Sequence, residues 1–343
     1  MEAKNQLVKA IEFKPIEPTR PTLFKFLNTY IPAIGTSVKD EYFNTKKLTK
    51  TSILNQVIEN YFINRMRTAY IKNETGIIKT ILTQIISISH DLKIYEAEAW
   101  RQYQGLTHSI GNEKIGNDTL CISINTSLLC YMGITGNCSN CKICYARNSN
   151  KMYSNEFLKN TISQLNFISY DALTLAAQTI QSIKEKYTKK QIKNLKFLRW
   201  NVNGDILNQQ QLLKTDIITY YLKKALKIPI AYSYSHNKKL NYEPVKNIVF
   251  NCSDHHNKTN KKTVQTRDTI TWEDLEKYNI CNGDCNGCSY CKDQDNHKKT
   301  LFLKHGGQRQ GVHGLNPYIM HYITEQKNID YLIFIRSHQE LQA

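Results

Sequence analysis

No stretch of this 343-residue chain approaches the roughly 18 consecutive apolar residues of a membrane-spanning helix, so no membrane partner is expected. The first twenty residues also lack a hydrophobic signal region, which argues against secretion and favours a cytoplasmic protein. Disulfides are rare in a reducing cytosol, so the ten cysteines indicate metal or redox chemistry. Hydrophobic residues make up 41% of the chain, enough for a sizeable core, which excludes a disordered protein.

A nucleotide-binding loop of the Walker type is also missing. The stretch HGGQRQG (305–311) is rich in glycine but lacks the Gly-Lys-Ser/Thr ending. Arginine is scarce, and lysine supplies most of the net charge of +17. Such a surface favours nucleic acid as a partner, bound through its phosphates without base readout, with residues 189–196 and 256–262 as candidate contacts. The alternative is a basic surface that is merely solvated.

Eight of the ten cysteines fall into two sets of four. The first cysteine block comprises Cys130, Cys138, Cys141 and Cys144, and the second comprises Cys281, Cys285, Cys288 and Cys291. Short Gly- and Asn-containing loops let several sulfurs point at one ion or cluster, and thiolates select zinc or iron–sulfur centres. Close succession within each block favours one or two iron–sulfur clusters over zinc, which remains the alternative.

Three regions are expected along the chain. Residues 1–112 form a mostly helical N-terminal extension, with helices starting near Thr51 and Ile77. Residues 113–275 form a β/α core that includes the first cysteine block. Residues 276–343 hold the second block, a cysteine-rich metal site, and the C-terminal segment.

Strand and helix patterns alternate in the core. Strands are expected at 195–205, 228–235 and 247–254, with a helix at 212–227. This α/β alternation favours parallel strands with right-handed crossovers. A partial or complete β/α barrel is the first interpretation, and a doubly wound sheet is the second.

Polar residues follow each predicted strand. Ligands of parallel α/β folds bind at the carboxyl ends of strands, so these residues can line one pocket: Asn203, Asp205, Ser235, His236, Asp254, His255 and His256. The ordinary alternative is that Asn-Gly-Asp is a turn and that the histidine pair faces solvent.

A series of motifs carries a family resemblance: the segment from Cys130 to CYAR, then RWNVNGD, IAYSYSH and LFLKHGGQRQG. In this order they are similar to the phage and plasmid family called gene product eighty-eight, and look like radical-SAM-like phage proteins with a Cys-Tyr-Ala signature. The resemblance covers about residues 115–313.

The resemblance implies a radical-SAM-like β/α barrel. In it, Cys144 and two of the other first-block cysteines bind a cluster, and S-adenosylmethionine is a candidate cofactor. Asp205 carries over as the acidic catalytic residue, and the candidate cofactor contacts are Tyr145, Asn203, Ser235 and His236. Two departures stand out: the first block lacks the Cys-x3-Cys-x2-Cys spacing, and His236 replaces the lysine of the family's strand motif.

The second block has that spacing at Cys281, Cys285 and Cys288, but it follows the predicted barrel and carries a fourth thiol, Cys291. It is therefore expected to be a closed auxiliary or structural site, and the first block is expected to be reactive. Two functions compete. One is a mobile-element iron–sulfur enzyme acting on nucleic acid or a nucleotide, and the other is a zinc-stabilised nucleic-acid-binding or replication accessory protein without catalysis.

Overall fold

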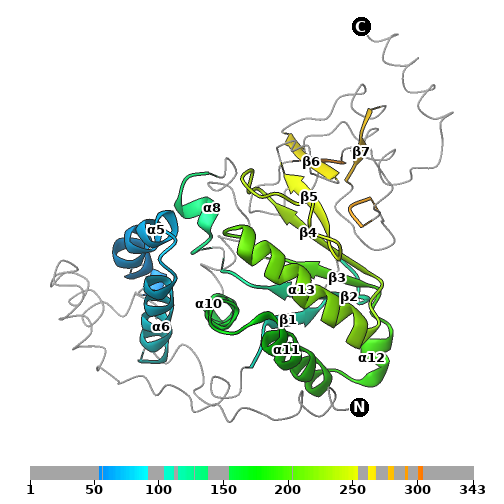
Figure 1. Cartoon of the computed structure of the whole chain (residues 1–343), viewed down its shortest axis with the longest axis horizontal. Helices are drawn as coiled ribbons and strands as arrows, with labels where there is room; N and C mark the ends of the chain where they lie inside the picture. The colour runs from blue at the N-terminus through cyan, green and yellow to red at the C-terminus, as the bar shows by residue number, and fades with distance from the viewer. Residues whose placement is uncertain are drawn as a thin grey trace, which may run out of the picture.

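The computed structural model combines a helical N-terminal part with a mixed α/β part (Figure 1). Apart from positions 56, 127 and 203, it describes residues 54–91, 104–111, 115–137, 154–253, 262–267, 277–281, 290–292 and 300–303. In this part of the chain no helix is both long and apolar enough to cross a bilayer.

The N-terminal part has helices at both predicted positions. A π-helical turn, Ile58–Phe62, leads into α5 (Ile63–Ile71), and α6 (Thr75–Asp91) follows. Their buried apolar side chains share one cluster with Leu129 and Phe157, from the segment after β2 and from α10. The helices therefore pack directly on the rest of the protein, while the boundary at residue 112 stays a prediction.

The α/β part is built on one sheet of eight strands in the order β1-β2-β3-β4-β5-β6-β8-β7. β1 pairs antiparallel with β2, and every other neighbouring pair is parallel. The strands are β1 Thr107–Ile110, β2 Thr119–Ser123, β3 Phe197–Trp200, β4 Ile230–Ser235, β5 Val249–Ser253, β6 Lys262–Arg267, β7 Asn279–Ile280 and β8 Thr300–Leu303.

Along the chain, the helices of the α/β part connect the first three parallel strands. α8 (Tyr131–Ile134), α10 (Ser154–Ser169), α11 (Ala172–Lys186) and α12 (Lys189–Lys193) connect β2 to β3, and α13 (Gln209–Leu226) connects β3 to β4. Side-chain caps fix where three of them begin, because each accepts hydrogen bonds from otherwise unsatisfied backbone N–H groups. The capping residues are Asp171 for α11, Thr188 for α12 and Asn208 for α13.

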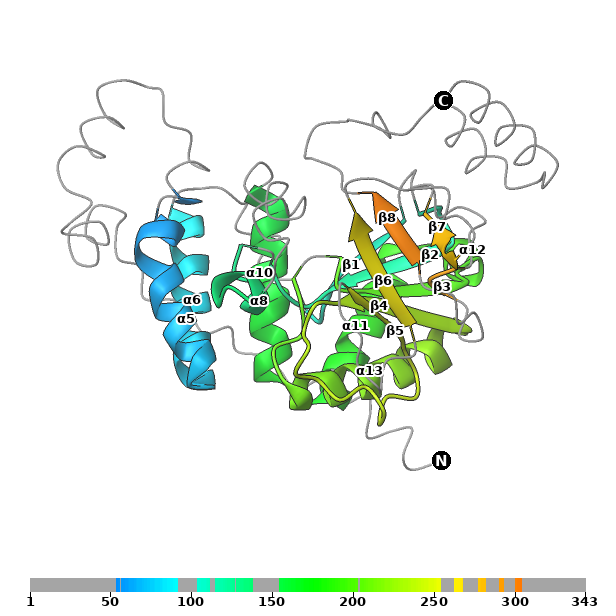
Figure 2. The same ribbon diagram turned by 90° about the horizontal axis from the view of Figure 1, so that it is seen from above.

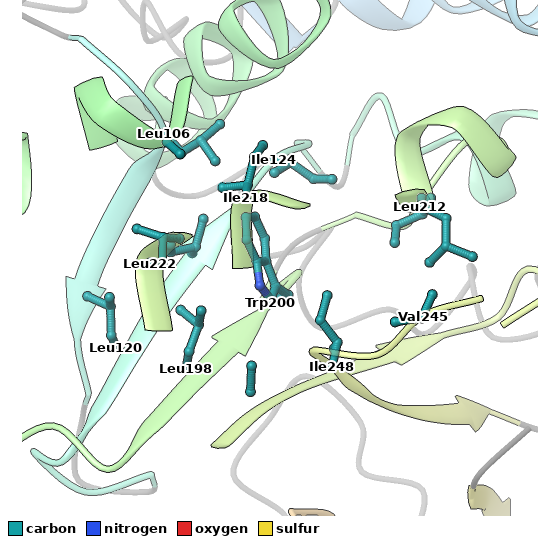
Figure 3. Close-up of a cluster of buried hydrophobic side chains, with 14 of the residues drawn as sticks. Leu106, Leu120, Ile124, Leu198, Trp200, Leu212, Ile218, Leu222, Val245 and Ile248 are labelled. Atoms are coloured by element: carbon teal, nitrogen blue, oxygen red, sulfur yellow. The ribbon is translucent and has the colours of Figure 1, made fainter. Parts of the chain in front are cut away.

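One face of the sheet packs on α11 and α13, which both lie below it in Figure 2. Alternate strand residues supply the apolar side chains of this helix-covered face. Trp200 is at its centre, with Leu198 beside it on β3 and Ile218 and Leu222 opposite on α13 (Figure 3). Other members include Leu120, Ile122, Ala231, Phe250, Cys252 and Leu175.

The strand order bears on the two topologies considered for the sheet. In a doubly wound sheet the order reverses in the middle, at a switch point. Here β2 to β6 follow one another along the sheet in chain order, and the only reversal among the described strands is at the β8–β7 edge. No described pairing joins β7 to β1, so this part of the sheet is open. The mixed α/β prediction is confirmed, and a radical-SAM barrel stays a prediction.

Candidate functional site

The carboxyl ends of β3 and β4 meet around the Asp205 side chain. Asp205 is 3% exposed, and its Oδ1 accepts hydrogen bonds from Ser235 Oγ at 2.8 Å and from Ile206 N at 2.7 Å. Its Oδ2 accepts from the backbone N of His236 at 2.6 Å. The structure therefore brings Asp205, Ser235 and His236 together, as the positions after parallel strands predict. Asn203 lies outside the described residues.

The environment of Asp205 explains its protonation behaviour. Burial raises the pKa of this carboxyl, and this effect outweighs the charge of His236 and the three hydrogen bonds, which lower it. Both oxygens are engaged by groups of the protein itself. This geometry suits a residue that positions the loops after β3 and β4.

A close backbone approach ties the loops after β2 and β3 together. Gly204 has φ +75°, and a Cβ at this position would lie 2.5 Å from Asn125 Cβ. Asn125, which follows β2, donates a hydrogen bond from Nδ2 to the Asp205 carbonyl oxygen. The Asn-Gly-Asp turn therefore needs glycine for both its backbone conformation and its space.

Further hydrogen bonds hold Ser235 and the residues next to it in place. Tyr242 OH donates to Ser235 Oγ at 2.7 Å, and Asn237 Nδ2 donates to the Ile206 carbonyl at 2.9 Å. Burial raises the pKa of Tyr242, so its hydroxyl keeps its proton. The chain from Tyr242 through Ser235 to Asp205 is buried, which makes this corner of the sheet rigid.

The start of the first cysteine block is held by the N-terminal helices. Cys130 is half-buried and directly precedes α8. On one side of it, Tyr70 OH donates to the Leu129 carbonyl at 2.8 Å, and on the other Arg67 Nε donates to the Ile134 carbonyl at 2.8 Å. Gln164 in turn donates to Tyr70 OH at 2.7 Å. The remaining predicted residues of this region lie outside the described residues: Cys138, Cys141, Cys144 and Tyr145.

The second cysteine block is attached to the other end of the sheet. Cys281 N donates to the Leu301 carbonyl in β8 at 2.9 Å, and the Cys291 carbonyl accepts from Asn251 Nδ2 in β5 at 2.9 Å. Cys285, Cys288, Asp254, His255 and His256 lie outside the described part. Within that part, no three His, Cys, Asp or Glu side chains gather as metal ligands would. The metal sites therefore stay predictions.

The face of the sheet opposite α11 and α13 is polar. Arg199 stacks its guanidinium over the Tyr234 ring at 5.5 Å, and Lys292 Nζ lies 3.8 Å from the centre of the Phe197 ring. Burial, followed by the neighbouring Cys291, raises the pKa of Tyr234. The sequence reasoning missed this face, for which Arg199 inside the otherwise apolar FLRW and the two tyrosines of AYSY are the local signals.

A comparison with known families adds one finding. The model of the family described as Gene product 88 matches residues 99–310, more than half of the chain. This chain belongs to the Gene product 88 family. The family match includes both cysteine blocks and the Asp205 corner, whereas α5 and α6, with Arg67 and Tyr70, precede it. No curated protein and no solved structure matches the chain.

Proposed function

We propose that the protein is a cytoplasmic mobile-element iron–sulfur protein, a radical-SAM-like enzyme that acts on nucleic acid or a nucleotide. The observation that carries the proposal is the place in the sheet from which the segment of the first cysteine block starts. It leaves the carboxyl end of β2, the first parallel strand of a sheet ordered like a β/α barrel, beside the loops that contain Asp205 and Ser235. Reactive centres of such folds form at this edge. Membership of the Gene product 88 family supports a phage or plasmid origin.

The ligand set fits an iron–sulfur cluster. Two groups of four cysteines offer thiolates, which iron–sulfur clusters require, and Cys130 is half-buried at the loop after β2. In this proposal Cys144 and two of Cys130, Cys138 and Cys141 hold the reactive cluster. A bound cluster would supply an electron to S-adenosylmethionine. The second block, with four thiols, is then a closed auxiliary site.

The protein's own residues have a positioning role in this scheme. Asp205 orients the backbone at Ile206 and at His236 through its hydrogen bonds. Ser235 is held by Asp205 and Tyr242 together. With Tyr145, these residues are the proposed surroundings of the cofactor. A fixed arrangement of this kind lowers the cost of orienting the reactants.

Nucleic acid is the proposed macromolecular partner. α12 presents Lys189, Lys190 and Lys193 to solvent, and the side chain of Lys196 is 70% exposed. Lysines neutralise phosphates without reading bases, so binding is expected to be weak, sequence-independent and steeply salt-dependent. Fluorescence anisotropy with single- and double-stranded ligands across salt concentrations measures it, and absence of binding at low salt contradicts it.

A second candidate is a zinc-stabilised binding or accessory protein. The contacts of the second block favour it, because Cys281 and Cys291 attach to β8 and β5 and a metal between them would tie these strands together. Structural zinc sites stabilise folds in this way. In that case both blocks would hold zinc.

Metal analysis of the full chain separates the two candidates. After anaerobic purification and reconstitution, we expect a brown protein with about four irons and four sulfides for each cluster, and iron in excess of zinc. Stoichiometric zinc without iron or sulfide would contradict the enzyme proposal and support the zinc-stabilised alternative.

A further inference from the structure

The register of the sheet aligns three polar residues on neighbouring strands. Trp200 in β3 pairs with Ser233 in β4, so Asn201, the next residue, is level with Tyr234. Tyr234 pairs in turn with Asn251 in β5. Asn201, Tyr234 and Asn251 therefore form one row across three strands, called here the amide row.

The amide row belongs to the polar face. Side chains alternate between faces along a strand, and Trp200 and Cys252 are part of the helix-covered core. Arg199 and Asn251, which neighbour them within the strands, therefore face the other way, and Asn201 directly follows the end of β3. Two contacts agree with this: Tyr234 lies under the Arg199 guanidinium, and Asn251 Nδ2 reaches the Cys291 carbonyl above the sheet.

The two asparagines of this row have amide atoms without a hydrogen-bond partner among the described residues. Asn201 is 6% exposed, and neither its amide nitrogen nor its amide oxygen has a hydrogen-bond partner in the described part of the chain. The Oδ1 of the fully buried Asn251 also has none there. Buried amides normally find partners, because leaving them unsatisfied is costly.

The backbone conformation of Asn201 also supports a ligand-binding role. Its φ of +53° is in the left-handed region, directly after β3 and at the edge where parallel sheets bind ligands. Such conformations are retained at functional sites although they are unfavourable. Asn201 therefore combines a left-handed backbone, which asparagine tolerates better than most residues, with a buried amide that has no partner among the described residues.

We propose that the amide row binds a nucleobase. A planar base offers adjacent donors and acceptors along its edge, which the amides of Asn201 and Asn251 complement, and the Tyr234 ring between them adds an aromatic contact. Other planar ligands also have adjacent donors and acceptors along an edge. That the ligand is a nucleobase rests on the proposed function. The base can belong to a nucleotide substrate or to an adenosyl cofactor.

The decisive variant is Asn201→Gly. Glycine adopts a positive φ without strain, so the variant removes the amide and keeps the turn. We expect nucleobase affinity to fall at least about tenfold, the discrimination that one bidentate amide–base pair provides. The melting temperature of the unliganded protein should stay nearly unchanged, because the lost amide makes no hydrogen bond to the described residues. Asn201→Ser provides the same test if the glycine variant does not fold.

Asn160→Ala is the matched control. Asn160 is also a buried asparagine whose amide has no partner in the described residues, but it lies in α10, away from β3, β4 and β5. Removing this amide should leave nucleobase binding unchanged. Equal losses of affinity in the two variants would mean that the effect is general and would overturn the proposal.

Isothermal titration of the full chain provides the measurement. The ligands are adenosine, guanosine, cytidine, uridine, their 5′-monophosphates and S-adenosylmethionine, whose separate titrations distinguish substrate from cofactor. Binding of at least one ligand that weakens in Asn201→Gly supports the proposal. No binding below about 1 mM by any ligand, or equal binding by wild type and Asn201→Gly, overturns it. Iron analysis of the same sample keeps the two proposals apart, since an iron-free chain that binds a base contradicts only the proposed function.

Discussion

The two faces of the sheet come from alternate residues of the same strands, yet they are built on different principles. On the helix-covered face, Trp200 and Leu198 are fully buried among apolar side chains of α13. On the opposite face, Arg199 stacks on Tyr234, and the Asn201 amide and the Asn251 Oδ1 lack partners in the described residues. The first arrangement is what stability favours. The second keeps buried polar groups of the kind that ligand recognition uses, although Trp200 Nε1 on the first face likewise has no partner among the described residues.

The largest expected effect is a difference in the free energy of unfolding between variants at two adjacent residues of β3. Trp200→Ala should lower the free energy of unfolding by about 3–5 kcal/mol, because it opens a cavity in the helix-covered core. Arg199→Met, one residue earlier on the polar face, should cost about 1 kcal/mol or less, because the side chain is half-buried and methionine keeps much of its apolar stem. Chemical denaturation of both variants measures the difference, and equal losses would break the comparison.

A pH dependence of intermediate size is expected from the helix-covered face. Burial, and to a smaller extent the charge of Lys186, lowers the pKa of His108 to about 3. The unfolded chain takes up this proton near pH 6.5 and the folded protein does not, so stability is complete above pH 6.5 and falls as the pH drops towards 3. The slope for one group is about 1.4 kcal/mol per pH unit.

The variant that tests this is His108→Gln, which can still form a hydrogen bond with Ser182 Oγ, the partner of His108 Nε2 at 3.0 Å. Denaturation midpoints between pH 7 and 5 should fall less steeply in the variant than in wild type. The same slope in both proteins would show that His108 titrates normally in the folded state.

A smaller loss of stability is expected where the N-terminal helices contact the start of the first cysteine block. Tyr70→Phe removes the hydroxyl that bonds the Leu129 carbonyl, directly before Cys130, and should cost about 1–2 kcal/mol. It should also speed the loss of metal from the first cysteine block to a chelator, because the segment is held less firmly. Tyr61→Phe is the control, since Tyr61 OH accepts a hydrogen bond from Arg65 within the helical region. Identical rates of metal loss would contradict a positioning role for Tyr70.

Much of the fold follows from local patterns in the sequence. The patterns at 195–205 and 247–254 predict strands, and the structure has β3 and β5 within these ranges. The meeting of Asp205 with Ser235 follows from parallel strands alone, since their carboxyl ends share one edge.

The rest depends on contacts that local patterns do not encode. The approach of Gly204 to Asn125 joins loops 79 positions apart, and the bond from Asn251 to Cys291 spans 40 positions. Neither leaves a periodic signal in the sequence. The lack of a partner for the Asn201 amide among the described residues is visible only in the three-dimensional structure. The roles of Tyr145, Asn203 and the remaining cysteines stay predictions, since these residues lie outside the described part.

The most direct test of the account is electron paramagnetic resonance of the dithionite-reduced full chain, recorded with and without S-adenosylmethionine. A cluster held by three thiolates has an open iron, whereas a cluster with four thiolates is closed, so only the first should respond to the cofactor. We predict a signal that changes shape on addition of S-adenosylmethionine in wild type and in the Cys285→Ala, Cys288→Ala double variant, but not in Cys144→Ala. A wild-type signal that the cofactor leaves unchanged, or a response that survives Cys144→Ala, would contradict the assignment of the first block as the reactive centre.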